Sequence, residues 1–394
     1  MKENRVYLDW AAATPLLPAV RTAMEPFLDG CFGNPSAIHA EGQIARNAVD
    51  SARAQVAAAV QVRPEFVTFT SGGTEGNNLA IFGVVEAFMN QGRSYESMTI
   101  ITTKIEHPSV GEAYAALERR GVQVQYVSVT ETGKVDLEHL RTLLDESTVL
   151  FSTALINSEI GTIQPTRALH KVFHEAETKY STQIFFHIDA AQAPLWVNCQ
   201  FDSLAADLVT FDAAKCCGPK GVGILVRGRR TDIVSVVHGG GQESGLRPGT
   251  ENVAGIVGAA VAISEAQINW RVQSEQVSLV RDEAIVYLQN ELSTVFINGA
   301  TGDDRVANNI NISIPGLDTE YAAVVLDTHG FAVSTKSACS GAGGGASTVV
   351  LETTKDPARA ASTLRITLGP ESTIEQLRSL TKVLKQHIEQ MQAY

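Results

Sequence analysis

The stretch FDAAKCCGPKGVGILV, residues 211–226, joins two apolar segments through a lysine, two cysteines and a Gly-Pro-Lys-Gly turn. Apolar residues at 208–211 and 223–226 predict two short strands around that turn. Lys215 therefore follows directly on the end of a strand, among small residues. A lysine in such a place can be desolvated enough to act as a nucleophilic amine, and a solvated loop lysine is the alternative interpretation.

Similar apolar runs recur before this stretch, and helix-length patterns separate several of them. The additional predicted strands lie at residues 66–69, 98–102, 123–127, 149–153 and 184–188, and helices are predicted at 74–87, 109–119 and 167–177. Alternation of this kind indicates an α/β fold with a mostly parallel seven-stranded sheet flanked by helices. In such a sheet the functional side chains are expected at the carboxyl ends of the strands.

The pattern changes after HGGGQESGLRPGT, residues 238–250. A long helix is predicted from 253 to 292, followed by strand-like NNINISI, a helix at 319–328, strand-like LRITL and an amphipathic C-terminal helix. We therefore expect a large domain at residues 15–255 and a smaller α+β domain formed by residues 1–14 and 256–394. The N-terminal MKENRVYLDW is interpreted as a first strand and not as a signal peptide, because no apolar segment follows its charges.

Composition limits the classes of partner. The 394 residues carry a net charge of −12, with 44% hydrophobic and 19% charged residues. An acidic chain without a basic cluster argues against nucleic acid or an anionic membrane, and no apolar run reaches the ~20 residues that span a bilayer. The five cysteines are odd in number and lack CxxC spacing, so free thiols in a reducing cytoplasm are expected.

Three further motifs place polar groups at predicted strand ends. Residues 71–74, Ser-Gly-Gly-Thr, open a helix and could cradle a phosphate or form a simple capped turn. Asp189 ends a buried strand, where it needs a cationic or donor partner or caps the next segment. His107 follows another strand end. A phosphate cup, a buried acid and the strand-end Lys215 together match the needs of pyridoxal 5′-phosphate, the cofactor that this sequence predicts.

These motifs carry a resemblance to the NifS-type cysteine desulfurases, in the class V aminotransferase group of fold-type I enzymes. It runs from VYLDWAAATP at residues 6–15 to LRITLG at 364–369. Between them stand FGNPSAIHAEG, TSGGTEGNNLAI, EHPSV, INSEIGTIQP, HIDAAQ, KCCGPKGVG, HGGGQESGLRPGTEN and STKSACSG. The resemblance implies conversion of L-cysteine to L-alanine, with the sulfur transferred to an enzyme cysteine as a persulfide.

The same resemblance assigns roles to individual residues. Lys215 would carry the cofactor, Cys339 would accept the sulfur, and Arg365 would grip the substrate carboxylate. The other implied cofactor contacts are His107 stacked on the ring, Asp189 at the ring nitrogen, Asn157 and Gln192 near the phenolic oxygen, Gly73 and Thr74 at the phosphate, and Thr250 reaching the phosphate of a neighbouring subunit. Asn157 would also approach the substrate, the enzyme would be a homodimer, and Cys339 could ligate an iron–sulfur species transiently in an otherwise metal-free protein.

Two positions depart from the family pattern. Where the family commonly has Ser-x-His-Lys at the phosphate, this chain has Asp212-Ala213-Ala214-Lys215. An aspartate there would repel a dianion unless it turned away or were neutralised. Cys216 and Cys217 replace apolar residues of the family and are expected to be buried packing residues, as are Cys31 and Cys199.

Two alternatives to the desulfurase stay open at this point. One is a selenocysteine lyase or another β-lyase on the same scaffold. The other is a cofactor-poor accessory protein, suggested by Asp212 and Ala214. For the desulfurase, the expected partner is a sulfur acceptor or an iron–sulfur scaffold protein, of an identity and pathway that the sequence does not name.

Overall fold

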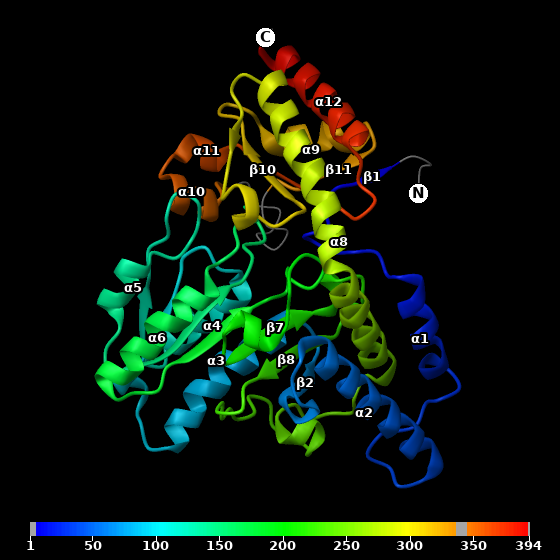
Figure 1. Ribbon diagram of the computed structural model, residues 1–394, viewed down its shortest axis with the longest axis vertical. Helices are drawn as coiled ribbons and strands as arrows, with labels where there is room; N and C mark the ends of the chain where they lie inside the picture. Colours follow the sequence, from blue (N-terminus) through cyan, green and yellow to red (C-terminus); the bar gives the residue numbers. More distant parts are fainter. Residues whose placement is uncertain (1–4, 336–344, 393–394) are drawn as a thin grey trace.

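A computed structural model describes residues 5–335 and 345–392 of the chain. Its centre is a seven-stranded sheet in the order β2-β8-β7-β6-β5-β3-β4 (Figure 1). The strands are β2 (Val67–Thr70), β3 (Thr99–Thr102), β4 (Gln123–Tyr126), β5 (Thr148–Ala154), β6 (Phe185–Asp189), β7 (Leu208–Asp212) and β8 (Gly223–Arg227). Only β8 runs antiparallel to its neighbours. The mostly parallel seven-stranded sheet predicted from the sequence is confirmed.

Alternate residues of the strands enter two separate cores, which is why these strands are almost continuously apolar. Leu150, Phe185 and Leu208 pack on one face of the sheet. Their chain neighbours Phe151, Phe186 and Val209 pack on the other face. Because both faces are covered, the polar groups at the strand ends are held on a rigid frame.

Helices cover both faces of this sheet. On one face lie α3 (Gly73–Asn90) and α4 (Pro108–Glu118); on the other lie α2 (Ala40–Val60), α5 (Leu137–Leu143), α6 (Thr166–Tyr180) and the first half of α8 (Val253–Glu291). The helix α1 (Pro18–Leu28) packs against α8. The sequence did not predict α1 or α2. The alanine-rich α2 offers little contrast between an apolar and a polar face, although seven of its residues are buried.

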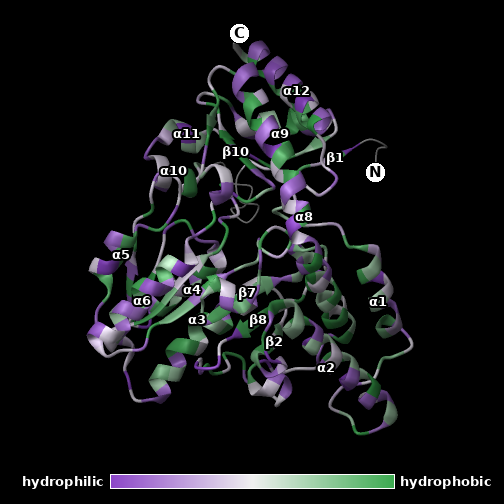
Figure 2. Cartoon of the chain, viewed as in Figure 1, coloured by the Kyte–Doolittle hydropathy of each residue, from purple (hydrophilic) through white to green (hydrophobic). Residues whose placement is uncertain are grey.

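The C-terminal part forms a smaller layer above the sheet in Figure 1. Its strands are β9 (Phe296–Ile297), β10 (Asn309–Ser313) and β12 (Thr363–Thr367), and its helices are α9 (Thr319–Thr328), α10 (Thr348–Thr354), α11 (Pro357–Ala361) and α12 (Ile374–Gln392). The N-terminal β1 (Val6–Tyr7) pairs in parallel with β11 (Phe331–Ala332). The helix α12 carries mostly hydrophilic residues (Figure 2), and its Leu377, Leu380 and Leu384 are buried.

The 39-residue α8 runs unbroken across the domain boundary expected at residue 255, so that boundary stays a prediction. By length and composition alone, α8 could cross a membrane, but 56% of its most apolar window is buried inside the protein. It packs against α1, α2 and α12. These contacts are those of a core helix.

Candidate active site

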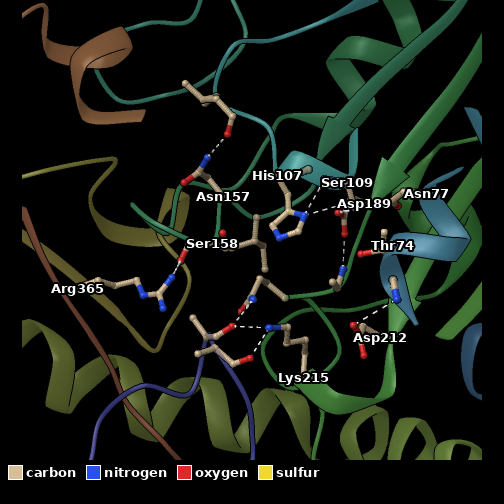
Figure 3. Close-up of a pocket in the computed structure, with 18 residues that line it drawn as sticks. Thr74, Asn77, His107, Ser109, Asn157, Ser158, Asp189, Asp212, Lys215 and Arg365 are labelled. Atoms are coloured by element: carbon tan, nitrogen blue, oxygen red, sulfur yellow. Dashed lines mark hydrogen bonds between the residues drawn. The ribbon is translucent and has the colours of Figure 1, made fainter. Parts of the chain in front are cut away.

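A cavity lies where the carboxyl ends of several strands of the large sheet converge. Most of the residues singled out in the sequence line it, and Figure 3 shows them around one space. The predicted residues in its wall are Gly73, Thr74, His107, Asn157, Asp189, Gln192, Asp212, Lys215 and Arg365. Thr74 and Arg365 are drawn on opposite sides of the cavity, so the site has two distinct ends.

Lys215 lies on a short 3₁₀ turn, Ala213–Lys215, that directly follows β7. Its Nζ donates hydrogen bonds to the carbonyl oxygens of Ala11, at 3.0 Å, and Ala12. These two residues belong to the segment that follows β1. Backbone carbonyls near the start of the sequence, about 200 positions before Lys215, therefore direct its amine.

Asp189, the last residue of β6, is buried in the cavity wall. Its Oδ1 accepts from the backbone N–H of Ala191 at 3.0 Å, and its Oδ2 accepts from Nδ2 of Asn77 at 2.7 Å. Both of these hydrogen-bond donors are neutral amides, so neither brings a positive charge to the carboxylate. A protonated ring nitrogen placed against this carboxylate would supply the missing positive charge.

His107 is the N-cap of α4, and its Nδ1 accepts from the backbone N–H of Ser109 at 3.1 Å. That contact requires a lone pair on Nδ1, so a neutral imidazole carries its proton on Nε2. Burial lowers the pKa of His107, the carboxylates of Asp189 and Asp212 oppose that effect, and the Lys215 charge adds to it. A neutral ring suits stacking and can accept a proton during turnover.

The N-terminus of α3 forms one end of the cavity. Helix α3 begins at Gly73, directly after β2 and the turn at Ser71. The backbone N–H of Gly73 already has an acceptor: Oδ2 of Asp212 lies 3.3 Å away. Asp212 does not turn away from the predicted phosphate position. Its Oδ1 accepts from the backbone N–H of Ala214 at 2.9 Å, which fixes the carboxylate there.

Arg365 lies at the other end, on β12, and is almost completely buried. Nη2 donates to Oδ1 of Asp9 at 2.8 Å, and Nη1 donates to the carbonyl oxygen of Ser158 at 3.2 Å. Its buried Nε has no hydrogen-bond partner among the residues that the structure describes. A guanidinium held on one side by Asp9 can still present donors to a carboxylate ligand.

Asn157 and Gln192 are both partly engaged with the backbone. Asn157 Oδ1 accepts from the N–H groups of Glu159 and Ile160, and one Nδ2 proton goes to the carbonyl of Ile105. Gln192 Nε2 donates to the carbonyl of Ala11, the same oxygen that holds Lys215. Each amide keeps one N–H that can point to a ligand.

Two of the predicted residues that the structure describes lie elsewhere. Ala214 and the exposed Thr250 are not among the described residues that line the cavity. Cys339 lies outside the described residues.

The cysteines beside Lys215 are packing residues. Cys216 and Cys217 are buried, as is Cys199, and burial raises the pKa of each of these thiols. The expectation of a buried thiol is wrong for Cys31, which is partly exposed because it follows the end of α1 in a surface turn.

Two polar residues beside the site were not predicted from the sequence, the buried Asn77 and the half-buried Glu106. Asn77 links Asp189 to Ser109, and its Oδ1 has no hydrogen-bond partner in the described structure. Glu106 accepts hydrogen bonds from Thr103, Thr153 and the N–H of Ala154. Asn77 lies within the motif TSGGTEGNNLAI and Glu106 is the first residue of the motif EHPSV, and this position is the signal in the sequence that could have identified them.

The arrangement fits pyridoxal phosphate at its ring end. Asp189 offers a buried carboxyl group with no ion pair among the described residues, Lys215 offers an amine, and His107 offers a neutral ring, all facing one cavity. The phosphate end fits less simply, because the carboxylate of Asp212 already lies at the helix N-terminus.

Comparison with known proteins agrees with this geometry. The family model described as aminotransferase class-V matches residues 6–380. A protein named cysteine desulfurase IscS, from Dictyoglomus turgidum, is 39% identical over 99% of this chain and 96% of its own length. A namesake from Clostridium botulinum is 36% identical over 98% of this chain and 95% of its own.

Solved structures give the same result. One described as a NifS-like protein has a TM-score of 0.89 and 32% identity, covering 98% of this chain and 100% of its own. Another, described as SspA in complex with cysteine, has a TM-score of 0.78 and 30% identity, covering 93% of this chain and 99% of its own.

Proposed function

The chain belongs to the aminotransferase class-V family, and from that premise we propose that it binds pyridoxal 5′-phosphate through Lys215. It is a cysteine desulfurase, as are the relatives that match its full length. The family consists of pyridoxal-phosphate enzymes. When bound, this cofactor supplies an electron sink for bonds at the α-carbon of an amino acid.

Several residues of the cavity would have separate roles at the pyridine ring of the cofactor. Asp189 would hold the ring nitrogen by a hydrogen bond, and Asn77 keeps that carboxylate in place through its 2.7 Å contact. His107 would cover the ring as a neutral imidazole. The free amine of Lys215 would take the α-proton of the substrate, and the carbonyls of Ala11 and Ala12 orient that amine.

L-Cysteine is the proposed substrate, and the neighbour solved in complex with cysteine supports this choice. Arg365, which lines the cavity, would bind its carboxylate with guanidinium N–H groups that Asp9 and Ser158 do not use. The thiolate of Cys339 attacks the substrate sulfur: an S–S bond forms, the C–S bond of cysteine breaks, and alanine leaves after reprotonation. A persulfide then remains on Cys339.

The observation that carries this proposal is the convergence of Lys215, Asp189 and His107 on one cavity. The test is to load the purified protein with pyridoxal phosphate and record its visible absorbance and its release of alanine from L-cysteine. Absence of a lysine-linked chromophore would contradict the cofactor assignment. Faster release of alanine from selenocysteine than from cysteine would favour the lyase alternative.

The setting of the enzyme is part of the proposal. We place it in the cytoplasm as a homodimer that passes sulfur to an acceptor or an iron–sulfur scaffold protein. The four described cysteines form no disulfide, which supports a reducing compartment. The exposed apolar side chains of Phe32 and Ile38 support burial at a subunit interface. Sedimentation equilibrium of the loaded enzyme tests the dimer, and a monomer would refute it.

A further inference from the structure

The phosphate end of the cavity contains a negative charge that belongs to the protein. Asp212 Oδ2 accepts from the first N–H of α3 at 3.3 Å. A methyl group added to Gly73 would lie 3.3 Å from the same oxygen and 3.4 Å from Cβ of Asp212, so the whole side chain lies against the helix start. Asp212 lines the cavity together with Gly73 and Thr74 (Figure 3).

The carboxylate is held there from both sides. Oδ1 of Asp212 caps the 3₁₀ turn by accepting from Ala214 at 2.9 Å, and the backbone of Asp212 belongs to β7. Rotation of the side chain away from the helix would give up both hydrogen bonds. Among the ion pairs of the described residues, none involves Asp212, so no guanidinium or ammonium contact neutralises it.

The charged groups around Asp212 do not remove its repulsion of a phosphate. Lys215 shares the cavity, but its amine is directed to the carbonyls of Ala11 and Ala12. The imidazole of His107 has its pKa lowered by burial. Burial raises the pKa of the Cys216 thiol, which therefore stays neutral. Glu75, on the first turn of α3, is itself paired with Arg247 at 2.9 Å.

From this geometry we infer that Asp212 makes the site select a protonated phosphate: carboxyl and phosphate share one proton whenever the cofactor binds. The inference rests on the proposed function. The second pKa of a phosphate monoester is about 6, so at neutral pH the free cofactor is mostly a dianion. Binding then takes up one proton from solvent, and an O–H···O bond replaces the repulsion between two anions.

Uptake of one proton gives binding a definite pH dependence. Above the second pKa of the phosphate, the affinity should fall about tenfold for each unit by which the pH rises. In a site without Asp212 the dianion binds directly to the N-terminus of α3, and the affinity should change little over the same range.

The experiment uses pyridoxine 5′-phosphate, which has the ring and the phosphate but no aldehyde, so it does not bond to Lys215. Its dissociation constant is measured by calorimetry from about pH 7 to about pH 9, the range in which free phosphate is a dianion. Wild-type protein should lose about tenfold in affinity per pH unit. Asp212→Asn should show a profile flatter by about tenfold per pH unit and tighter binding at the upper end. Calorimetry in buffers of different ionisation enthalpy should register about one proton more taken up by wild type than by the variant.

A matched control is Asp136→Asn, which removes a capping carboxylate at the start of α5, outside the cavity wall. It should behave as wild type. Asp212→Ser keeps a cap for Ala214 and serves if the asparagine variant folds poorly. Equal pH profiles for wild type and both Asp212 variants would overturn the inference while leaving the proposed function intact. Failure of every protein to bind the probe would instead refute the proposed function.

Discussion

Two lysines five residues apart have opposite surroundings. Lys215 is directed into the cavity by two backbone carbonyls, whereas Lys220 is exposed in the Gly-Pro-Lys-Gly turn. Of these two lysines, Lys215 is the one that lines the cavity together with Asp189. The chemistry of this stretch therefore depends on one amine, and the neighbouring thiols are too buried to ionise at neutral pH.

Replacement of Lys215 tests that assignment directly. Lys215→Ala should lose the lysine-linked visible chromophore and lower the rate of alanine formation by at least about a thousandfold, because a proton-transfer group and the covalent anchor are removed together. Lys220→Ala should keep the absorbance and the turnover of wild type. A chromophore that survives in Lys215→Ala and disappears in Lys220→Ala would mean that the anchor is Lys220.

Glu106 should make stability depend on pH. Burial raises the pKa of Glu106 from 4.5 to about 7, against the hydrogen bonds from Thr103, Ala154 and Thr153 that lower it. The folded state thus binds the proton more tightly than the unfolded chain does. The stabilisation is complete below pH 4.5 and is lost as the pH rises through about 7.

The corresponding variant is Glu106→Gln, whose amide does not titrate. Between about pH 5 and about pH 8, the free energy of unfolding of wild type should fall relative to the variant by up to about 3 kcal/mol. Denaturant unfolding at several pH values measures this difference. Glu131→Gln, at an exposed position, is the control and should follow wild type. Parallel curves for Glu106→Gln and wild type would show that Glu106 does not titrate in this range.

At the scale of elements, the approach of α3 to β7 depends on a glycine. A methyl group added to Gly76 in α3 would lie 2.7 Å from Cγ2 of Thr210 in β7. Helix α3 carries the amide at one end of the cavity and strand β7 carries Asp212. The distance between these elements therefore determines the width of the phosphate end.

Two helical glycines give opposite predictions. Gly76→Ala should destabilise the protein by about 1–3 kcal/mol, because the extra methyl overpacks the contact with Thr210. Gly111→Ala in α4, where a Cβ would meet nothing within 4 Å, should instead stabilise it by up to about 1 kcal/mol. Denaturant midpoints test both. A stabilising Gly76→Ala would show that α3 can move away from the sheet without cost.

The elements were predictable from the sequence to different degrees. All seven strands of the large sheet were predicted to within two residues at each end, because strands buried on both faces are apolar runs that no surface helix imitates. The site residues on those strands were likewise predictable from their place at strand ends. The contacts of Asp9 with Arg365 and of Ala11 with Lys215 were not, because each joins residues more than 200 positions apart.

For the whole molecule, α8 and the contacts beside it connect the sheet to the C-terminal part. A helix of 39 residues is about 58 Å long and packs against α2 at one end and α12 at the other. The carbonyl of Glu159 accepts from the side chains of Asn309 and Asn311, at 3.0 Å each. These contacts couple the two parts of the molecule energetically.

That coupling predicts cooperative unfolding. Scanning calorimetry of the purified protein should show one transition whose calorimetric and van't Hoff enthalpies agree, even though the chain is large enough for two domains. Two resolved transitions would instead support independent domains with a boundary near residue 255.

The position of β1 has a consequence for biosynthesis. Residues 6–12 are made long before the segments that they contact, since β1 pairs with Phe331–Ala332 and Asp9 pairs with Arg365. At about 5–20 residues per second, a ribosome needs roughly 15–65 s to travel from β1 to β11. Throughout that time the carbonyls that orient Lys215 are not anchored by β11 and Arg365, so a nascent chain has an incomplete active site. Under the proposed function, loading with cofactor follows translation, and a chain truncated before residue 331 has Lys215 but not the segments that anchor the carbonyls directing it.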